Sequence, residues 1–418
     1  MFHQTQTLVI GGGAVGICCG HYINELGKQV AVVEKDGICS GSSYGNAGLI
    51  VPSHSIPLAA PGVISQGLKW MFNPVSPFYI KPRFQRGLLS WVWKFCSACN
   101  RHHVQRSIPV LRDLSFASLK LFDELAKIEG IDFEYAKNGV LTLFNTHKGF
   151  EHSVKEARLL QQHGVANRIL QKAELKEFIG EMRTTAIGGV FFPQDAQLDP
   201  ERFVRLLARC VAKKGLNLLT SVEVIGFETA GRLVKAVKTT RGDIAVEEVV
   251  LAGGAWSPEI ARDLQLKLWI EPAKGYSLTF KRPSRCPATP INFAEARVFY
   301  TPMAETVRLS GTMALCGFDL SIDRRRTQAI LNAVPEYLPD FDARPLELVE
   351  IWRGLRPCSP DGLPYIGRPP CYDNLIIAAG HGMLGISLAP ITGKIVSQLT
   401  VNEIPSIDTA ALSVERFN

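Results

Sequence analysis

The segment TLVIGGGAVGICCGHYINELGKQVAVVEK, Thr7–Lys35, decides the fold of this chain. Its first residues, Thr7–Ile10, form a mostly apolar run that predicts a short buried strand. Ala14–Leu26 carries apolar residues along one stripe and is followed by Gly27, which predicts a helix that stops there. Gln29–Val33 predicts a second strand, so the segment is a strand–helix–strand unit of about 30 residues.

Three glycines and one acid in this unit have the spacing of a dinucleotide-binding motif. Gly11 permits the tight turn after the strand, Gly13 lets the backbone approach a pyrophosphate, and Gly16 lets the helix pack closely on the sheet. The pyrophosphate then lies at the positive end of the helix dipole. Glu34 follows Gly16 by 18 positions and can accept hydrogen bonds from a ribose diol. This acid favours FAD or NAD over NADP, but these residues alone do not separate FAD from NAD.

The overall composition excludes several other classes of protein. The 418 residues are 46% hydrophobic and 20% charged, with a net charge of +7 from scattered basic residues, unlike the dense basic stripe of a nucleic-acid binder. The ten cysteines lack the spacing of a disulfide framework, and Cys96–Cys99 has no second pair for zinc, which predicts free thiols and no metal. No secretory signal and no apolar run of about 18 residues is present. We expect a cytoplasmic protein, either free or held peripherally on the cytoplasmic face of the inner membrane.

Three later segments favour FAD. Gly37–His54 is a loop rich in glycine and serine, whose backbone N–H groups can continue along a pyrophosphate toward a flavin ring. Val249–Pro258 predicts a buried strand that runs into a glycine turn and returns beside the first unit. Asn374–Leu399 predicts a strand, a glycine-rich turn and a helix. We expect the N-terminus of that helix, near Gly382–Ser387, to face the negative charge of a reduced flavin.

Motifs along the whole chain also carry a family resemblance. They are GGGAVG (Gly11–Gly16), SSYGNAGLIVPSH (Ser42–His54), PLAAPG (Pro57–Gly62), LKWMFNPVSPFYIKP (Leu68–Pro82), PAKGYSLT (Pro272–Thr279), WRGLRPCSPDGLPYIG (Trp352–Gly367) and AAGHGMLGISLAPITGK (Ala378–Lys394). With these motifs the chain resembles the FAD-dependent D-amino-acid oxidase superfamily and, within it, the bacterial D-amino-acid dehydrogenases of the small-subunit type.

The resemblance implies an α/β fold with two domains. A two-dinucleotide-binding, Rossmann-like FAD domain is expected from residues 1–55, 150–265 and 350–418. An α+β substrate domain, built on an antiparallel sheet, is expected from residues 56–149 and 266–349. The sequence agrees coarsely, since Pro109–Ile128 has helical periodicity and Arg297–Thr301 and Val307–Gly311 resemble short strands.

The resemblance also implies a set of residues around noncovalent FAD. They are Gly11, Gly13, Ala14, Val15, Gly16, Glu34, Lys35, Ser42, Ser43, Asn46, Ala47, Gly48, Leu49, Val224, Ala252, Gly253, Trp256, Gly354, His381, Gly382, Met383, Leu384, Gly385 and Ile386. A covalent link through cysteine is known in related sarcosine oxidases, but that cysteine would fall on Gly354 and not on Cys358.

Oxidising an α-amino acid through a flavin requires few protein groups. The substrate carboxylate needs a fixed cation, and a guanidinium is the best fork for its two oxygens. By resemblance, Arg356 in GLRP is that clamp. Tyr276 is a candidate to hydrogen-bond the carboxylate or the amine, although it can also be an ordinary strand tyrosine. His54 is a candidate to line the pocket beside the flavin, although a lone histidine is more often structural.

The predicted function is FAD-dependent oxidative deamination of D-amino acids, with hydride transfer from the substrate α carbon to flavin N5 and electrons passed to a quinone or other carrier. Three alternatives stay open: a D-proline or 4-hydroxy-D-proline dehydrogenase, an oxygen-using glycine or D-amino-acid oxidase, and the flavin subunit of a heteromeric amine dehydrogenase. The string Tyr44–Leu49 departs from the D-alanine type and leaves the substrate open. Phe84–His103 mixes tryptophans with basic residues, as in an interfacial helix, but a core helix of the substrate domain fits the same pattern.

Overall fold

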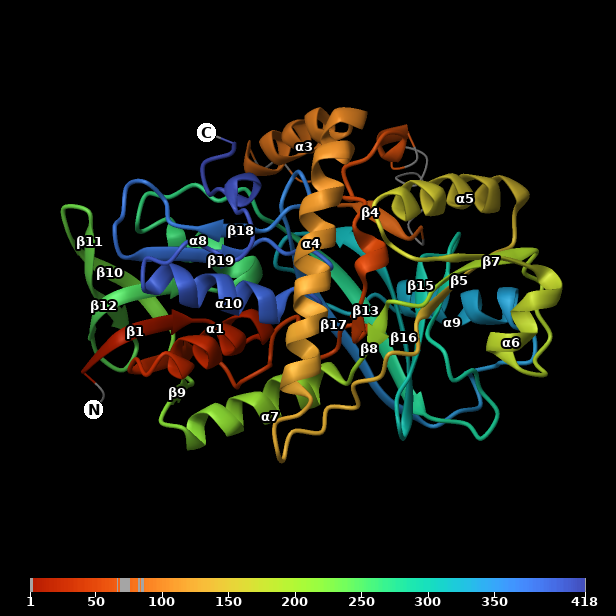
Figure 1. Cartoon of the computed structure of the whole chain (residues 1–418), viewed down its shortest axis with the longest axis horizontal. Helices are drawn as coiled ribbons and strands as arrows, with labels where there is room; N and C mark the ends of the chain where they lie inside the picture. The colour runs from red at the N-terminus through yellow and green to blue at the C-terminus, as the bar shows by residue number, and fades with distance from the viewer. Residues whose placement is uncertain (1–2, 66, 68–75, 82, 84–85, 418) are drawn as a thin grey trace.

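The computed structural model describes residues 3–65, 67, 76–81, 83 and 86–417. Leu68–Val75 and Pro82 of the predicted LKWMFNPVSPFYIKP motif, and Phe84 and Gln85 of the predicted interfacial helix, lie outside the described residues. Among the described residues, two large sheets form the two halves of the molecule, and the long helix α4 (Arg101–Leu125) runs between them (Figure 1).

The first sheet contains the predicted strand–helix–strand unit. In the described part of the chain its strands are β1 (Gln4–Ile10), β2 (Val30–Glu34), β9 (Asn217–Thr220), β10 (Val224–Ala230), β11 (Leu233–Thr239), β12 (Ile244–Leu251), β18 (Tyr365–Gly367) and β19 (Leu375–Ala379). The strands β19, β12, β1, β2 and β9 are parallel neighbours. The prediction that the strand at Val249 returns beside the first unit is confirmed, and the strand predicted at Asn374 pairs with it on the far side.

Helices α1 (Ala14–Glu25), α7 (Pro200–Lys213) and α10 (Ala389–Thr400) pack together beside this sheet (Figure 1). α1 ends where Gly27 was expected to stop it. Gly27 has φ +75° and donates its N–H to the Asn24 carbonyl oxygen at 2.9 Å. α8 (Ser257–Ala261) packs near β10, and the buried side chains between these helices and β1, β2, β12 and β19 form the core of this half.

The second sheet is mostly antiparallel. Its described strands are β4 (Phe78–Ile80), β5 (Val140–Phe144), β6 (Arg168–Gln171), β7 (Gly188–Phe192), β13 (Glu271–Lys281), β14 (Ile291–Phe293), β15 (Val298–Pro302), β16 (Thr306–Leu315) and β17 (Leu348–Cys358). A separate pair is formed by β3 (Leu49–Ile50) and β8 (Ala196–Gln197). The other described helices are α3 (Arg86–Ala98), α5 (His147–Gln162), α6 (Lys176–Ile179) and α9 (Arg324–Tyr337), with short 3-10 turns η1 (Pro52–His54), η2 (Lys172–Leu175), η3 (Gly254–Trp256) and η4 (Ala410–Leu412).

The α/β fold class is confirmed, but two predicted domain boundaries cut across the second sheet. β6 and β7 begin after residue 150, and β17 spans residue 350, yet all three pair within that sheet. We propose that the FAD-binding unit resumes near α7 and again after Cys358. The helix predicted from Pro109 begins earlier, at Arg101, because the Asn100 side chain caps it by accepting the His103 N–H at 2.9 Å.

Candidate active site

A cavity of about 530 Å³ lies at the carboxyl ends of β1 and β12, where α/β sheets commonly bind ligands. Most of the residues expected around FAD line it: Gly11, Gly13, Ala14, Val15, Glu34, Lys35, Ser42, Ser43, Asn46, Val224, Ala252, Gly253, Trp256, Gly354, His381, Gly382, Met383, Gly385 and Ile386. Ala47 and Leu49 line a smaller neighbouring cavity, while Gly16, Gly48 and Leu384 line neither.

The dinucleotide motif shapes one end of the large cavity. Gly11 has φ +117°, and a Cβ at Gly16 would overlap the Gly11 carbonyl oxygen. The N-terminus of α1 is therefore held against the end of β1. The N-cap of this helix is Gly13, which has no side chain to accept the first N–H groups. Of these groups, the Ala14 N–H donates to Ser43 Oγ at 2.9 Å. This arrangement is a ready anion site at a helix N-terminus.

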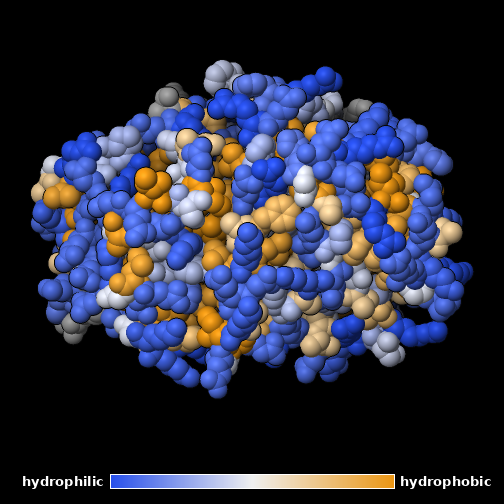
Figure 2. Space-filling model, in the orientation of Figure 1, coloured by the Kyte–Doolittle hydropathy of each residue, from blue (hydrophilic) through white to orange (hydrophobic). Residues whose placement is uncertain are grey.

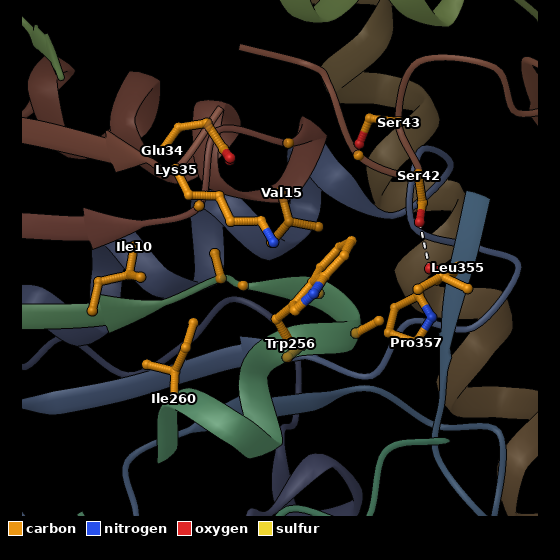
Figure 3. Close-up of a pocket in the computed structure, with 18 of the residues that line it drawn as sticks. Ile10, Val15, Glu34, Lys35, Ser42, Ser43, Trp256, Ile260, Leu355 and Pro357 are labelled. Carbon is orange, nitrogen blue, oxygen red and sulfur yellow. Dashed lines mark hydrogen bonds between the residues drawn. The ribbon is translucent and has the colours of Figure 1, made fainter. Parts of the chain in front are cut away.

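Glu34 and Lys35 put opposite charges at this end. Glu34 Oε2 accepts the Gly12 N–H at 2.7 Å and Oε1 accepts the Asp36 N–H at 3.1 Å, which fixes the carboxylate while leaving lone pairs for hydroxyl donors. The Lys35 side chain reaches toward Trp256, with Nζ 4.3 Å from the ring centroid (Figure 3). These groups fit the adenylate half of FAD. The Glu34 carboxylate suits the ribose hydroxyls, and the Lys35 ammonium and the N-terminus of α1 suit the phosphates.

The loop 42–49 closes the other end of the large cavity. Ser42 Oγ donates to the Leu355 carbonyl oxygen on β17 (Figure 3). Asn46 braces the loop internally, because its Nδ2 donates to the Ser43 carbonyl oxygen at 2.9 Å and its Oδ1 accepts the Gly48 N–H at 2.8 Å. Thr301 Oγ1 donates to the Ala47 carbonyl oxygen at 2.8 Å. The loop that was expected to continue toward the flavin is thus fixed on the second sheet.

A second cavity of about 90 Å³ adjoins the first and shares Arg356 with it. The Arg356 guanidinium donates from Nη1 to the Thr312 carbonyl oxygen at 2.9 Å and lies against Gly275. In the part of the chain that the structure describes, no carboxylate lies within ion-pair distance of Arg356. Burial lowers the pKa of its guanidinium from the ordinary value, so an anion in this cavity would compensate an otherwise unpaired cation.

His54 lines the same small cavity, as expected for a pocket residue. Its ring lies edge-on to Phe299, with the ring centroids 5.9 Å apart. Burial, with a smaller contribution from Arg297, lowers the pKa of His54 to about 4, so the imidazole is neutral at pH 7. The turn that carries it is held by Asp195, whose Oδ1 accepts the Ser53 N–H at 3.0 Å and whose Oδ2 accepts from Ser53 Oγ at 2.5 Å.

Tyr276 is among the residues that line the small cavity with Arg356, and its expected contact with the substrate stays a prediction. Residues directly opposite in the β13–β17 pair share a face, and Arg356 is opposite Ala273 whereas Tyr276 is opposite Arg353. The Tyr276 side chain packs in the core beneath α9. Its hydroxyl donates to the Ser321 carbonyl oxygen at 3.4 Å and accepts the Asp323 N–H at 3.3 Å. The Tyr276 hydroxyl therefore anchors the chain at Ser321 and Asp323, while the residue itself borders the small cavity.

Gly382, Met383, Gly385 and Ile386 line the large cavity, but they precede the helix. α10 begins only at Ala389, with Leu388 as its N-cap, so the predicted helix start was several residues too early. His381 is buried, and its Nε2 lies 3.0 Å from Thr392 Oγ1. Burial lowers the pKa of His381 to about 3, and this neutral histidine ties the turn to α10.

Sequence reasoning missed several walls of the small cavity. They are Gly45, Val51, Gly275, Phe299, Ser310 and Trp352. A strand alternates its side chains, so residues two and four positions before Arg356 share its face. Gly354 was expected, and that parity alone would also have indicated Trp352. Among the described residues, no cluster of acids, histidines and cysteines could hold a metal.

A dinucleotide-sized cavity opens beside a half-buried guanidinium that has no carboxylate partner among the described residues, and this arrangement fits a flavin-dependent oxidoreductase. The family model for FAD dependent oxidoreductases matches residues 6–399. The chain therefore belongs to this family, and FAD is its cofactor.

Curated relatives extend over nearly the whole chain. A D-amino acid dehydrogenase of Granulibacter bethesdensis is 30% identical over 418 residues, covering 99% of each protein. A D-amino acid dehydrogenase of Helicobacter pylori is 32% identical over 398 residues, covering 95% of each.

Solved structures show the same fold. Glycine oxidase from Geobacillus kaustophilus is 24% identical with a TM-score of 0.82, covering 100% of both chains. L-proline dehydrogenase from P. horikoshii is 21% identical with a TM-score of 0.78, covering 100% of this chain and 98% of the other.

Proposed function

We propose that this protein oxidises D-amino acids with FAD and passes the electrons to a carrier other than oxygen. The observation that carries the proposal is the Arg356 guanidinium, which has no carboxylate partner among the described residues and lines both the FAD cavity and the small cavity. A substrate carboxylate is the natural partner for such a fork. The names of the curated relatives supply the D configuration and the dehydrogenase reaction.

We assign separate roles in this reaction to two residues of the small cavity, Arg356 and His54. Arg356 binds the carboxylate and fixes the α carbon toward the neighbouring FAD cavity. His54, which is neutral at pH 7, can accept the proton that the substrate ammonium loses before oxidation. Bound FAD supplies the acceptor for the hydride that leaves the α carbon. The resulting imino acid is hydrolysed by water to an oxo acid and ammonia.

The primary test is an anaerobic titration of the purified yellow protein with paired D- and L-amino acids, D-proline and 4-hydroxy-D-proline. We expect bleaching of the flavin by D forms alone. Bleaching by L forms, or by no amino acid, would overturn the proposal. Admitting air and then a quinone analogue separates an oxidase from a dehydrogenase, and we expect rapid reoxidation only with the quinone.

Arg356→Ala tests the clamp itself. We expect the variant to keep FAD but to bind D-alanine at least about 100-fold more weakly, because a charge-assisted bond pair is lost. The matched control is D-alaninamide, which has no carboxylate and should bind equally weakly to wild type and variant. An equal loss for D-alanine and D-alaninamide would contradict the clamp.

We also propose peripheral contact with the membrane, where a quinone acceptor resides. Among the described residues no helix has the length and apolar character of a membrane span. α3 buries Trp91 but leaves Leu89 59% and Trp93 68% exposed on its outer side. On the face drawn in Figure 2, apolar residues lie in separate patches among hydrophilic ones. Cosedimentation with anionic vesicles should fall in Leu89→Ser and Trp93→Ser, and unchanged cosedimentation would refute this contact.

A further inference from the structure

The floor of the small cavity is a pair of glycines. Gly275 on β13 lies directly opposite Gly354 on β17. Arg356 and Trp352 share the face of these glycines, because side chains two residues apart on a strand point the same way. The floor therefore carries no side chain of its own between the guanidinium and the indole.

The Trp352 indole lies between this floor and the loop 42–49, here called the flavin-side loop. A Cβ at Gly354 would lie 2.6 Å from Trp352 Cζ2 and 2.9 Å from Cζ3. A Cβ at Gly45 would lie 2.5 Å from Cε3 and 2.7 Å from Cγ. Any larger residue at either position would displace the ring, so the two glycines form a slot that holds the indole in the cavity wall.

The volume of the cavity sets a limit on what it can accept. It measures about 90 Å³, whereas a cavity of about 150 Å³ is known to accommodate benzene. The walls around it are mostly apolar and include Leu49, Val51 and Phe299. Of its lining side chains, only Arg356 carries a charge at pH 7, because His54 is neutral. Within this space alone, a phenyl or indole side chain has less room than benzene needs.

We propose that Trp352 is the residue that limits the substrate to short aliphatic D-amino acids and five-membered cyclic imino acids. The inference rests on the proposed function and names the substrate class of that same site. Trp352 makes this selection by occupying the space that a larger side chain would need. The glycines at positions 45 and 354 contribute by giving the indole its slot.

The test compares D-alanine and D-phenylalanine as reductants of the holoenzyme under anaerobic conditions, in wild type, Trp352→Ala and Trp352→Phe. We expect wild type to favour D-alanine by at least about 100-fold, within the range that pocket size can supply. Trp352→Ala should shift the ratio toward D-phenylalanine by at least about 100-fold, and Trp352→Phe by a smaller factor. Trp269→Phe, at a tryptophan that lines neither cavity, is the matched control and should leave the ratio unchanged.

Each outcome decides a separate point. Failure of every D-amino acid to reduce the wild-type flavin refutes the proposed function itself. Reduction of wild type by D-phenylalanine and D-alanine alike refutes the role of Trp352, and so does an unchanged ratio in the variants. Where Trp352→Ala loses its flavin, Trp352→Phe decides the matter, because it keeps a ring between the two glycines. An unshifted ratio in that variant overturns the inference.

Discussion

Replacing Gly275 with alanine should displace the Arg356 guanidinium, the proposed carboxylate clamp, without changing the arginine itself. The added Cβ would lie 2.5 Å from Arg356 Cζ and 2.6 Å from Nη2, whereas ordinary contact begins at 3.4 Å. The guanidinium must therefore withdraw by at least 0.9 Å, the difference between 3.4 and 2.5 Å. The third neighbouring atom, Nη1, lies closer still and is the atom that donates to the Thr312 carbonyl oxygen.

The size of the effect follows from that displacement. A misplacement of about 1 Å at a reacting site costs about 100-fold in rate or affinity. A hydrogen bond to a charged group contributes about 1.5–3 kcal/mol, which is the same range. We therefore expect the Kd of D-alanine to rise about 100-fold in Gly275→Ala, while FAD binding and the free energy of unfolding change far less.

The assay is the anaerobic reduction of the flavin at increasing D-alanine concentration, with FAD content and thermal unfolding measured on the same preparation. Gly87→Ala is the matched control, because no atom of the described residues lies within 4 Å of a Cβ at that exposed helix position. D-alaninamide separates a displaced clamp from general damage, since its weak binding should not change. A wild-type Kd for D-alanine in Gly275→Ala would refute the placement of Arg356 over this glycine.

Three further predictions concern single side chains. Burial raises the pKa of Asp195 from 3.8 to about 7, so between these values the folded protein holds a proton that the unfolded chain has lost. The free energy of unfolding of the wild type should therefore fall as the pH rises from about 4 to about 7. Asp195→Asn, which can keep both bonds to Ser53, should lack this fall in thermal unfolding curves. His54 with a pKa of about 4 should protonate in acid, so the rate of flavin reduction should fall as the pH is lowered through about 4 in wild type, and His54→Gln should be slower at pH 7 and lack this acid limb. Cys358→Ser should bind as much FAD as wild type, and acid precipitation should release the flavin from both proteins, because no covalent link is expected.

Local patterns were enough to predict the dinucleotide-binding half. Strand β1, helix α1 and strand β2 follow one another in sequence, and each is defined by apolar spacing and by a glycine or an acid at its end. The strand at Val249 was also recognisable, because a parallel strand buried on both faces is a continuous apolar run. Contacts within about thirty residues therefore determine the unit from which this half is built.

The direction of the Tyr276 side chain could not be predicted in the same way. β13 is buried along ten consecutive residues from Glu271 to Phe280, so no alternation of polar and apolar residues reveals which side chains face the cavity. Its facing is set by pairing with β17, whose first residue lies 67 positions beyond the last residue of β13, 348 minus 281. A long-range register of this kind leaves no local signal. The expected boundary at residue 350 cuts through β17 for a related reason, since this strand starts in the second sheet and ends at the cofactor cavity.

The two cavities share one set of supports. Ser42 on the flavin-side loop donates to the carbonyl oxygen of the residue before Arg356. Arg308 on β16 donates from Nη1 to the Asn46 carbonyl oxygen of the same loop at 2.9 Å. Four positions further along β16, Thr312 holds the Arg356 guanidinium through its carbonyl oxygen. Because the same strands fix the loop and the clamp, any shift of the loop against the second sheet also changes the distance between cofactor and substrate carboxylate. If Arg356 is the clamp, as proposed, the position of the substrate relative to the flavin depends on these strands and on the side chains of Ser42, Arg308 and Arg356 that tie them together.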